Sequence, residues 1–325
     1  MSAIRPRRLR FHPVLREALT QTRLSPADFI APLFIRPGTA VRTPVKSMPG
    51  VFQLSVDSAV EELKRLQQLG VGGYILFGVT DAAHKDATGT WAHNPDNEVC
   101  RTLKAARDAG VTMLAITDLC YCEYTRHGHC GPLTAAGLVD NDATIVQLGE
   151  QAALHAQCGA DMVAPSAMMD NMVTAIRNAL DSVGFQNTAI LSYAVKYASS
   201  FYGPFRDAAE SPPQFGDRKT YQMDFRRSAK EALHEAALDV AQGADMVMVK
   251  PGIAYLDILR AVTEAVNVPT AVYQVSGEYA MLKAAASNGW IDEKPIVLET
   301  MHAFKRAGAS LILTYYAGQL AEWVG

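Results

Sequence analysis

The chain has 325 residues, of which 49% are hydrophobic and 19% are charged, and its 30 basic and 33 acidic residues give a net charge of −3. This apolar content with so little net charge excludes a disordered chain and predicts a globular protein with a large core. A near-neutral balance provides no basic surface for nucleic acid or an anionic membrane, and no apolar run approaches the roughly 18 residues of a membrane span. Five cysteines are too few for a disulfide scaffold. We therefore expect a cytoplasmic protein without nucleic-acid or membrane partners.

Eight short apolar runs predict buried parallel strands, because each is rich in strand-forming residues and is flanked by Gly, Asp or Pro. They cover residues 29–35, 73–77, 112–117, 161–164, 189–195, 244–249, 270–275 and 310–315. Amphipathic segments between them predict helices at 56–69, 97–109, 143–157, 172–182, 227–241, 254–266, 279–286 and 296–306. Three junctions share one pattern, in which a glycine (Gly159, Gly243 or Gly308) ends a helix directly before a strand.

The alternation of eight strands with helices predicts an α/β protein folded as a (β/α)8 TIM barrel. An open, doubly wound sheet is the alternative, but no G-x-G-x-x-G motif follows an early strand. We expect residues 1–25, which are rich in arginine, to form an N-terminal arm that contacts a neighbouring subunit. Residues 26–325 are then a single catalytic barrel domain.

Polar side chains stand where the predicted strands end, which is where barrel enzymes carry their chemistry. These residues are Asp118, Ser166, Lys196, Lys250, Ser276 and Tyr315. Lys196 and Lys250 follow apolar runs on neighbouring strands, which lie about 4.8 Å apart in a sheet. Burial and mutual repulsion lower lysine pKa values, and a neutral amine is a nucleophile that forms Schiff bases with carbonyls. A single lysine of this kind is more often solvated or ion-paired, but two on adjacent strands favour a carbonyl substrate.

A cluster of cysteines follows the third strand. Cys120, Cys122 and Cys130 have the spacing C-x-C-x7-C, and three thiolates can occupy three corners of a tetrahedral zinc site. The fourth corner is then open to water or substrate, although His127 or His129 can also fill it and close the site. The alternative is a set of reduced thiols in an exposed loop.

The long connection after the fifth strand predicts a lid, because extended structured loops in compact domains often cover active sites. Arg206 and Arg218 lie within it, and the guanidinium group is suited to binding a carboxylate. A solvated loop with incidental arginines is the alternative for either residue alone.

The chain resembles the porphobilinogen synthase (5-aminolevulinate dehydratase) family over nearly its whole length. The most specific matches are Asp-Leu-Cys-Tyr-Cys at 118–122, Ala-Pro-Ser-Ala-Met-Met-Asp at 164–170, Met-Val-Lys-Pro-Gly at 248–252 and Tyr-Gln-Val-Ser-Gly-Glu-Tyr at 273–279. A fifth match, at 193–208, is Tyr-Ala-Val-Lys-Tyr-Ala-Ser-Ser-Phe-Tyr-Gly-Pro-Phe-Arg-Asp-Ala. The resemblance implies a lyase that condenses two 5-aminolevulinate molecules into porphobilinogen, with loss of two waters, in tetrapyrrole (heme) biosynthesis.

The resemblance also implies a role for each candidate residue. Lys250 would form a Schiff base with the first substrate, Lys196 would engage the second, and Asp118 would assist proton transfer. The substrate-binding residues would be Arg206, Arg218 and Gln222 for the second substrate's carboxylate, Ser276 and Tyr315 for the first's, and Ser166 at the end of the fourth strand. Cys120, Cys122 and Cys130 would bind Zn²⁺, and Glu235 would bind an allosteric Mg²⁺. The family is commonly octameric.

Two other functions are compatible with parts of the sequence. A class I aldolase is also a barrel with a Schiff-base lysine, but it needs one such lysine and a site for phosphate or hydroxyl groups. A non-catalytic zinc-binding scaffold would need neither lysine. The two lysines together with the three cysteines favour the dehydratase.

Overall fold

The computed structural model describes residues 4–325, so residues 1–3 of the predicted arm lie outside the described residues. Eight parallel strands close into a barrel, because the last strand pairs with the first through Phe29 and Ile312. The strands are β1 (Phe29–Ile35), β4 (Gly73–Gly78), β5 (Leu114–Leu119), β6 (Met162–Pro165), β7 (Ala189–Lys196), β8 (Met246–Lys250), β9 (Thr270–Tyr273) and β10 (Leu311–Leu313). The predicted (β/α)8 TIM barrel is therefore confirmed.

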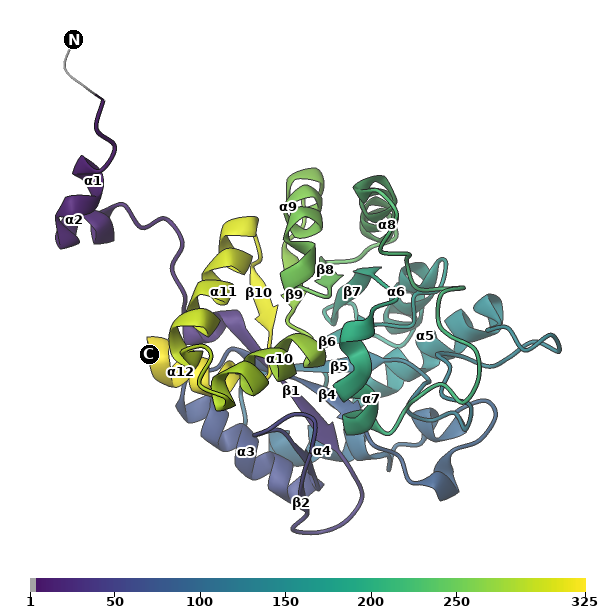
Figure 1. Cartoon of the computed structure of the whole chain (residues 1–325). Helices are drawn as coiled ribbons and strands as arrows, with labels where there is room; N and C mark the ends of the chain where they lie inside the picture. The colour runs from purple at the N-terminus through teal and green to yellow at the C-terminus, as the bar shows by residue number, and fades with distance from the viewer. Residues whose placement is uncertain (1–3) are drawn as a thin grey trace.

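Helices surround the barrel between its strands (Figure 1). They are α3 (Val56–Gln68), α4 (Glu98–Asp108), α5 (Asn141–Cys158), α6 (Met172–Ser182), α8 (Ala229–Ala241), α9 (Leu256–Ala265), α11 (Glu293–Ala307) and α12 (Ala317–Val324). Two further helices, α7 (Gly203–Ala209) and α10 (Ser276–Ser287), lie after β7 and β9, beyond the strand ends. Short 3-10 turns cover Pro26–Asp28, Ala82–His84, Thr90–His93, Ser200–Tyr202 and Ile253–Tyr255. None of the helices within residues 4–325 has the length and apolar character needed to cross a bilayer.

Some strand bounds differ from the prediction for local reasons. The third barrel strand, β5, begins at Leu114 rather than at 112, because the Thr112 N–H donates to the Gln67 side chain (2.6 Å) instead of to a strand. Asp118 lies inside β5 and not just after it, because pairing with β6 continues through Asp118 and Leu119. β9 ends at Tyr273 because Val275 already belongs to the start of α10, where its N–H donates to the Glu278 carboxylate (2.9 Å).

The three glycine junctions are built alike. Gly159, Gly243 and Gly308 have φ angles of 110°, 106° and 112°, a region that favours glycine. After each glycine, the next residue's N–H bonds back to a carbonyl five positions earlier, as in Ala160 to His155 (3.0 Å). Each helix is thus followed by its strand after a short connection, such as Gly159, Ala160 and Asp161 between α5 and β6.

The Asp that follows two of these glycines orders the start of the preceding strand. The Asp161 carboxylate accepts from the Ala115 N–H (2.9 Å), and the Asp245 carboxylate accepts from the Ile190 N–H (2.8 Å). These bonds satisfy backbone donors at the end of the barrel where the strands begin, opposite the end that carries the candidate functional side chains.

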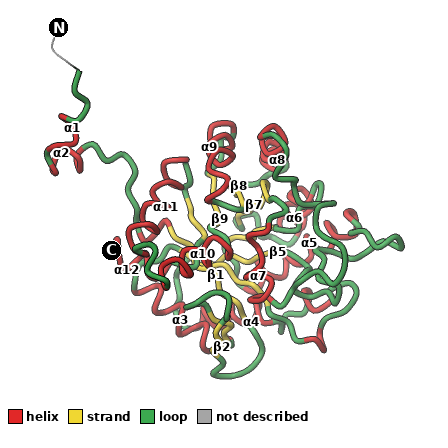
Figure 2. Tube along the Cα trace, in the orientation of Figure 1, coloured by secondary structure: helices red, strands yellow, loops and turns green. Residues whose placement is uncertain are grey.

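The N-terminal segment lies away from the barrel (Figure 2). It carries the short helices α1 (Arg8–Phe11) and α2 (Pro13–Ala18), neither of which has a buried residue. A hairpin of β2 (Arg42–Pro44) and β3 (Phe52–Leu54) extends the sheet beside the end of β1.

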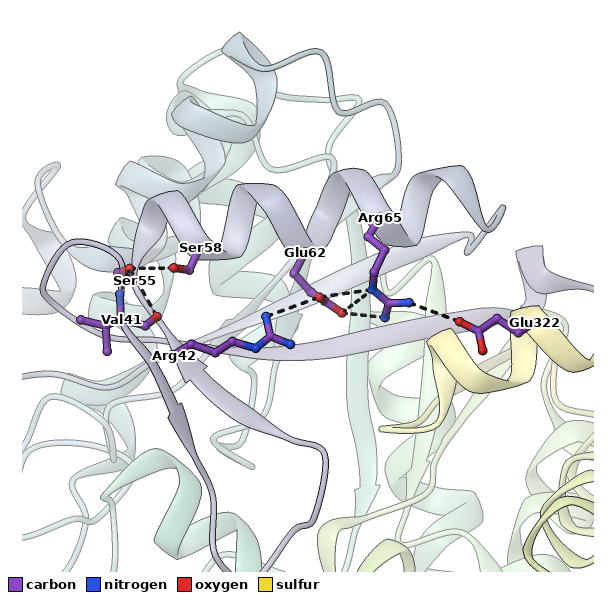
Figure 3. A network of polar contacts seen from close by, with 7 residues as sticks. All are labelled: Val41, Arg42, Ser55, Ser58, Glu62, Arg65 and Glu322. Carbon is purple, nitrogen blue, oxygen red and sulfur yellow. Dashed lines mark hydrogen bonds and ion pairs between the residues drawn. The ribbon is translucent and has the colours of Figure 1, made fainter.

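Ion pairs join the hairpin to the first and last helices of the barrel (Figure 3). Glu62 on α3 pairs with Arg42 (3.7 Å) and Arg65 (2.8 Å), and Arg65 also reaches Glu322 on α12 (3.5 Å). Because most of these groups are partly exposed, each pair contributes little stability on its own.

Candidate active site

The two predicted lysines lie directly opposite each other at the ends of β7 and β8. This pairing depends on a β-bulge, because Ser192 pairs with Val247 whereas Val195 pairs with Val249. If the ladder continued regularly from Ser192, Lys196 would lie opposite Pro251, and its side chain would point to the other face of the strand. The extra residue in β7 turns Lys196 to the same side as Lys250.

Both amino groups lie in one cavity. Lys196 and Lys250 are 5% and 6% exposed and line the same cavity at the carboxyl ends of the strands. Their Nζ atoms lie 5.6 and 5.0 Å from the centroid of the same Tyr193 ring. The Lys196 Nζ donates to the Ser166 carbonyl, whereas the Lys250 Nζ is surrounded by aromatic rings, the nearest being Tyr273 at 4.4 Å.

The environment of Lys250 favours its neutral form. Burial, and secondly the charge of Lys196, lower the pKa of Lys250 to about 7, against an opposing effect of Asp118. Burial raises the pKa of Asp118 to about 6, while the two lysines act to lower it. Asp118 also accepts a hydrogen bond from the Ser166 hydroxyl (3.1 Å). A nucleophilic amine and a carboxyl group able to exchange protons near neutrality thus lie in one cavity.

The three cysteines come together beside this cavity. The sulfur atoms of Cys120, Cys122 and Cys130 lie within 4.8 Å of one another, and all three side chains are buried. Gly131 allows the returning loop to approach α5, because a Cβ there would lie 2.0 Å from the Thr144 hydroxyl. Three soft sulfur donors at this spacing fit a tetrahedral zinc ion with one position open to the cavity, which Cys122 also lines.

The two nearby histidines are engaged elsewhere. The ring nitrogens of His129 lie 3.1 Å from the Tyr221 hydroxyl and 3.1 Å from the Phe215 carbonyl. Those of His127 contact the Ala87 carbonyl (3.1 Å) and the His129 N–H (3.1 Å). Neither side chain belongs to the cluster of close sulfur ligands among residues 4–325. The alternative in which a histidine closes the metal site is therefore disfavoured.

The lid segment, residues 197–223, covers the cavity. Its two ends are held together where the Met223 N–H donates to the Lys196 carbonyl (3.0 Å). Its middle is held by Ser276, whose hydroxyl accepts from the Phe205 N–H (2.9 Å) and donates to the Phe201 carbonyl (3.2 Å). The Phe205 ring lies 5.2 Å from the Lys250 Nζ, so the lid shields this amine from water.

Two guanidinium groups of the lid line the cavity. Arg218 donates to the carbonyls of Gly128 (2.8 Å) and Ser211 (3.0 Å), but the buried Nε atoms of Arg218 and Arg206 have no hydrogen-bond partner within the described part of the chain. Burial, and secondly the charge of Arg218, lower the pKa of Arg206. Two adjacent cations with unpaired donors can bind an anionic group such as a carboxylate.

The remaining predicted residues lie farther from this cavity. The Tyr315 hydroxyl is 3.0 Å from the hydroxyl of Tyr273, whose ring contacts Lys250, and Ser276 is engaged with the lid. Gln222 lines a separate, larger cavity that also contains Glu235. The residues that line the cavity of the two lysines are Phe77, Asp118, Cys122, Glu123, Ser166, Lys196, Tyr202, Phe205, Arg206, Arg218 and Lys250.

Glu235 belongs to an acidic group on that second cavity. Burial, followed by the charges of Asp170 and Glu231, raises the pKa of Glu235. Carboxylates of this kind can hold Mg²⁺, which often binds through one or two carboxylates and several waters. Among residues 4–325, however, these groups do not form a cluster of three close ligand atoms.

Sequence reasoning missed Glu123, Tyr193 and Tyr273. Glu123 directly follows Cys122 in the sequence, and this position in the cysteine loop could have identified it as a residue near the site. Tyr193 lies three residues before Lys196, and only the bulge brings the two to the same side of β7. Tyr273 ends β9, the strand next to β8. Such positions are recognisable once the register of the barrel is known.

The fold and this cavity define an enzyme of the (β/α)8 barrel class. The model of the delta-aminolevulinic acid dehydratase family matches residues 3–323. The chain is 53% identical over 323 residues to the delta-aminolevulinic acid dehydratase of Synechococcus elongatus, covering 98% of each protein. It is 48% identical over 318 residues to that of Escherichia coli, covering 98% of this chain and 97% of the relative.

A solved structure gives the same result. The porphobilinogen synthase of Toxoplasma gondii, in complex with the reaction product porphobilinogen, matches with a TM-score of 0.97 and 43% identity. The match covers 99% of this chain and 92% of that one. The chain therefore belongs to the delta-aminolevulinic acid dehydratase family, whose members are lyases.

Proposed function

We propose that this chain condenses two molecules of 5-aminolevulinate into porphobilinogen, with loss of two water molecules, in tetrapyrrole (heme) biosynthesis. Family membership supports the reaction. The observation that carries the mechanism is the direct pairing of Lys196 and Lys250 in one cavity, because two ketone substrates call for two amines.

Lys250 forms a Schiff base with the first substrate. Its Nζ attacks the ketone carbon, the carbonyl oxygen leaves as water, and the resulting imine stabilises negative charge on the adjacent carbon. The lowered pKa of Lys250, about 7, supports this role because a neutral amine is the reacting form. Lys196 engages the ketone of the second substrate, and Asp118, with Ser166 beside it, moves protons between the reacting groups.

The two substrate carboxylates are bound at separate places. The carboxylate of the second substrate is bound by Arg206 and Arg218, with Gln222 nearby. The buried guanidinium donors without partners among residues 4–325 support this assignment. Ser276 and Tyr315 bind that of the first, and the contact from Tyr315 through Tyr273 to Lys250 supports this arrangement.

Cys120, Cys122 and Cys130 bind Zn²⁺. When bound, the ion would supply a Lewis acid that polarises or orients the second substrate. Lys196 and Asp118 would then act on a substrate already held at the edge of the cysteine loop.

Further features follow from the same family. Glu235 binds an allosteric Mg²⁺, which the neighbouring acidic charges support. The enzyme is a cytoplasmic octamer in which residues 1–25 form an arm around a neighbouring subunit and residues 26–325 form the catalytic domain. The absence of buried residues in α1 and α2 supports a partner surface for the arm.

Trapping of the Schiff base tests this function. Borohydride reduction in the presence of 5-aminolevulinate should add one substrate-sized mass to Lys250, and a Lys250→Ala variant should show none there. A colorimetric assay for pyrrole product, with and without zinc, tests the overall reaction. A protein that forms no pyrrole under either condition would refute the proposed function, and full activity of metal-free protein would remove zinc from the mechanism.

A further inference from the structure

A buried carboxyl group in the catalytic cavity has a free oxygen. Glu123 is 3% exposed and lines the cavity together with both lysines. Its Oε2 accepts a hydrogen bond from the Gly78 N–H (3.0 Å), whereas its Oε1 has no hydrogen-bond partner among residues 4–325. A buried polar atom without a partner is costly, so this oxygen is suited to a ligand that supplies one.

Glu123 differs from the other carboxyl group of the cavity. Asp118 accepts from the Ser166 hydroxyl (3.1 Å), and both active-site lysines act on its charge. The lysine that acts on Glu123 is Lys85, whose Nζ donates instead to the Glu210 carbonyl (2.8 Å). The Asp118 Oδ1 likewise has no hydrogen-bond partner among residues 4–325, but both active-site lysines act on the charge of Asp118. Among the same residues, no ion pair involves Glu123.

The chemistry of the substrate indicates what this partner is. Each 5-aminolevulinate carries a ketone, a carboxylate and an amino group. Lysines account for the ketones, and arginines and hydroxyl groups account for the carboxylates, so the amino group has no assigned partner in the protein. A carboxyl group pairs with an amine in either form, because a carboxylate accepts from an ammonium and a carboxylic acid donates to a free amine.

We propose that the Glu123 Oε1 binds the amino group of the substrate whose nitrogen remains outside the ring, as the aminomethyl group of the product. The position of Glu123 directly after Cys122 places this contact on the side of the cavity formed by the cysteine loop. The inference rests on the proposed function, and it makes Glu123 a determinant of specificity for amino-ketone substrates over simple keto acids.

The test compares the product with the same pyrrole dicarboxylate lacking the aminomethyl group. Both ligands fill both substrate positions, so their affinity ratio isolates the amine. Glu123→Gln keeps an acceptor for the Gly78 N–H but presents an amide NH₂ to the ligand. Measured by calorimetry, the Glu123→Gln substitution should weaken porphobilinogen binding about 10- to 150-fold. The affinity for the analogue should change less than about threefold.

A matched control is Glu278→Gln. Glu278 is also a buried carboxyl, but it accepts from the backbone N–H groups of Val275 (2.9 Å) and Ile253 (2.6 Å) and does not line the cavity. The Glu278→Gln variant should leave the ratio of the two affinities unchanged, even if the affinity for both ligands falls. Should Glu123→Gln fail to fold, Glu123→Asp withdraws the carboxyl group by one methylene and should lower the ratio in the same direction.

The outcomes separate the two proposals. A ratio in Glu123→Gln equal to that of the wild type, whether or not both affinities fall, overturns the role of Glu123. Wild-type protein that neither forms nor binds porphobilinogen overturns the proposed function instead.

Discussion

Lys196 faces Lys250 because β7 contains one residue more than β8 between Ser192 and Lys196. The bulge places two amino groups over the Tyr193 ring, at 5.6 and 5.0 Å from its centroid. β-bulges commonly redirect side chains next to active sites. Here the redirection also has an electrostatic consequence, since the charge of Lys196 helps to lower the pKa of its neighbour.

The first prediction concerns the pH dependence of Schiff-base formation at Lys250. Its pKa of about 7 lies below the ordinary value of 10.5, so the neutral amine predominates above pH 7. The rate of trapping of a simple keto acid with cyanoborohydride should therefore be half-maximal near pH 7 and level off above about pH 8. At pH 6 the neutral fraction, and with it the initial rate, should be about a tenth of the plateau value.

Lys196→Met provides the control for this prediction. Removing the second amino group removes one cause that lowers the pKa of Lys250, so the midpoint of the rate profile should move to higher pH. Mass spectrometry of the trapped protein locates the adduct. A profile that continues to rise beyond pH 9 in the wild type would show that Lys250 is an ordinary lysine.

The second prediction separates the two lid arginines. Arg206→Met should raise KM for 5-aminolevulinate about 10- to 100-fold, because a charge-assisted hydrogen bond to the carboxylate is lost. Its melting temperature should stay the same or rise, since Arg206 is half-buried beside the like charge of Arg218. Steady-state kinetics and thermal melting check both parts.

Arg218→Met is the matched comparison. It removes the donors to the Gly128 and Ser211 carbonyls, and each buried acceptor left without a donor costs about 1–3 kcal/mol. Arg218→Met should thus lower the melting temperature as well as raise KM. If Arg206→Met destabilises the protein as much as Arg218→Met does, both arginines act mainly in holding the lid.

The third prediction concerns metal binding. Cys122→Ala removes one of three clustered sulfur atoms and should weaken zinc binding at least about 100-fold. Losing a residue that only hydrogen-bonds to a metal ligand already lowers metal affinity about 10- to 100-fold. Metal analysis after dialysis should find the variant largely free of zinc and inactive. Cys158→Ala, at the end of α5 and outside the cluster, should keep both its zinc and its activity. Equal zinc content in the two variants would contradict the assignment.

The sequence was sufficient to predict the barrel and that the two lysines, and the three cysteines, come together at its strand ends. Lysines that close apolar runs, and cysteines that crowd a loop, are unusual enough to be recognised without coordinates. The bulge in β7 could not be predicted, because no glycine or proline marks it and it arises from how β7 and β8 pair. The free oxygen of Glu123 likewise depends on the position of Gly78, which is 45 residues away in the chain.

The last prediction concerns the glycine junctions at the opposite end of the barrel. Alanine at Gly243, where φ is 106°, should cost about 1–2 kcal/mol for backbone conformation alone, since the nearest atom to a new Cβ would be 3.6 Å away. At Gly308 the new Cβ would lie 2.4 Å from the Thr263 methyl group, which adds about 1–3 kcal/mol of overpacking. The melting temperature should therefore be highest for the wild type, lower for Gly243→Ala and lowest for Gly308→Ala. The kcat at 25 °C should stay unchanged, because both junctions lie before the strands, at the end of the barrel away from the cavity. Equal melting temperatures for the two variants would mean that Thr263 moves aside at no cost.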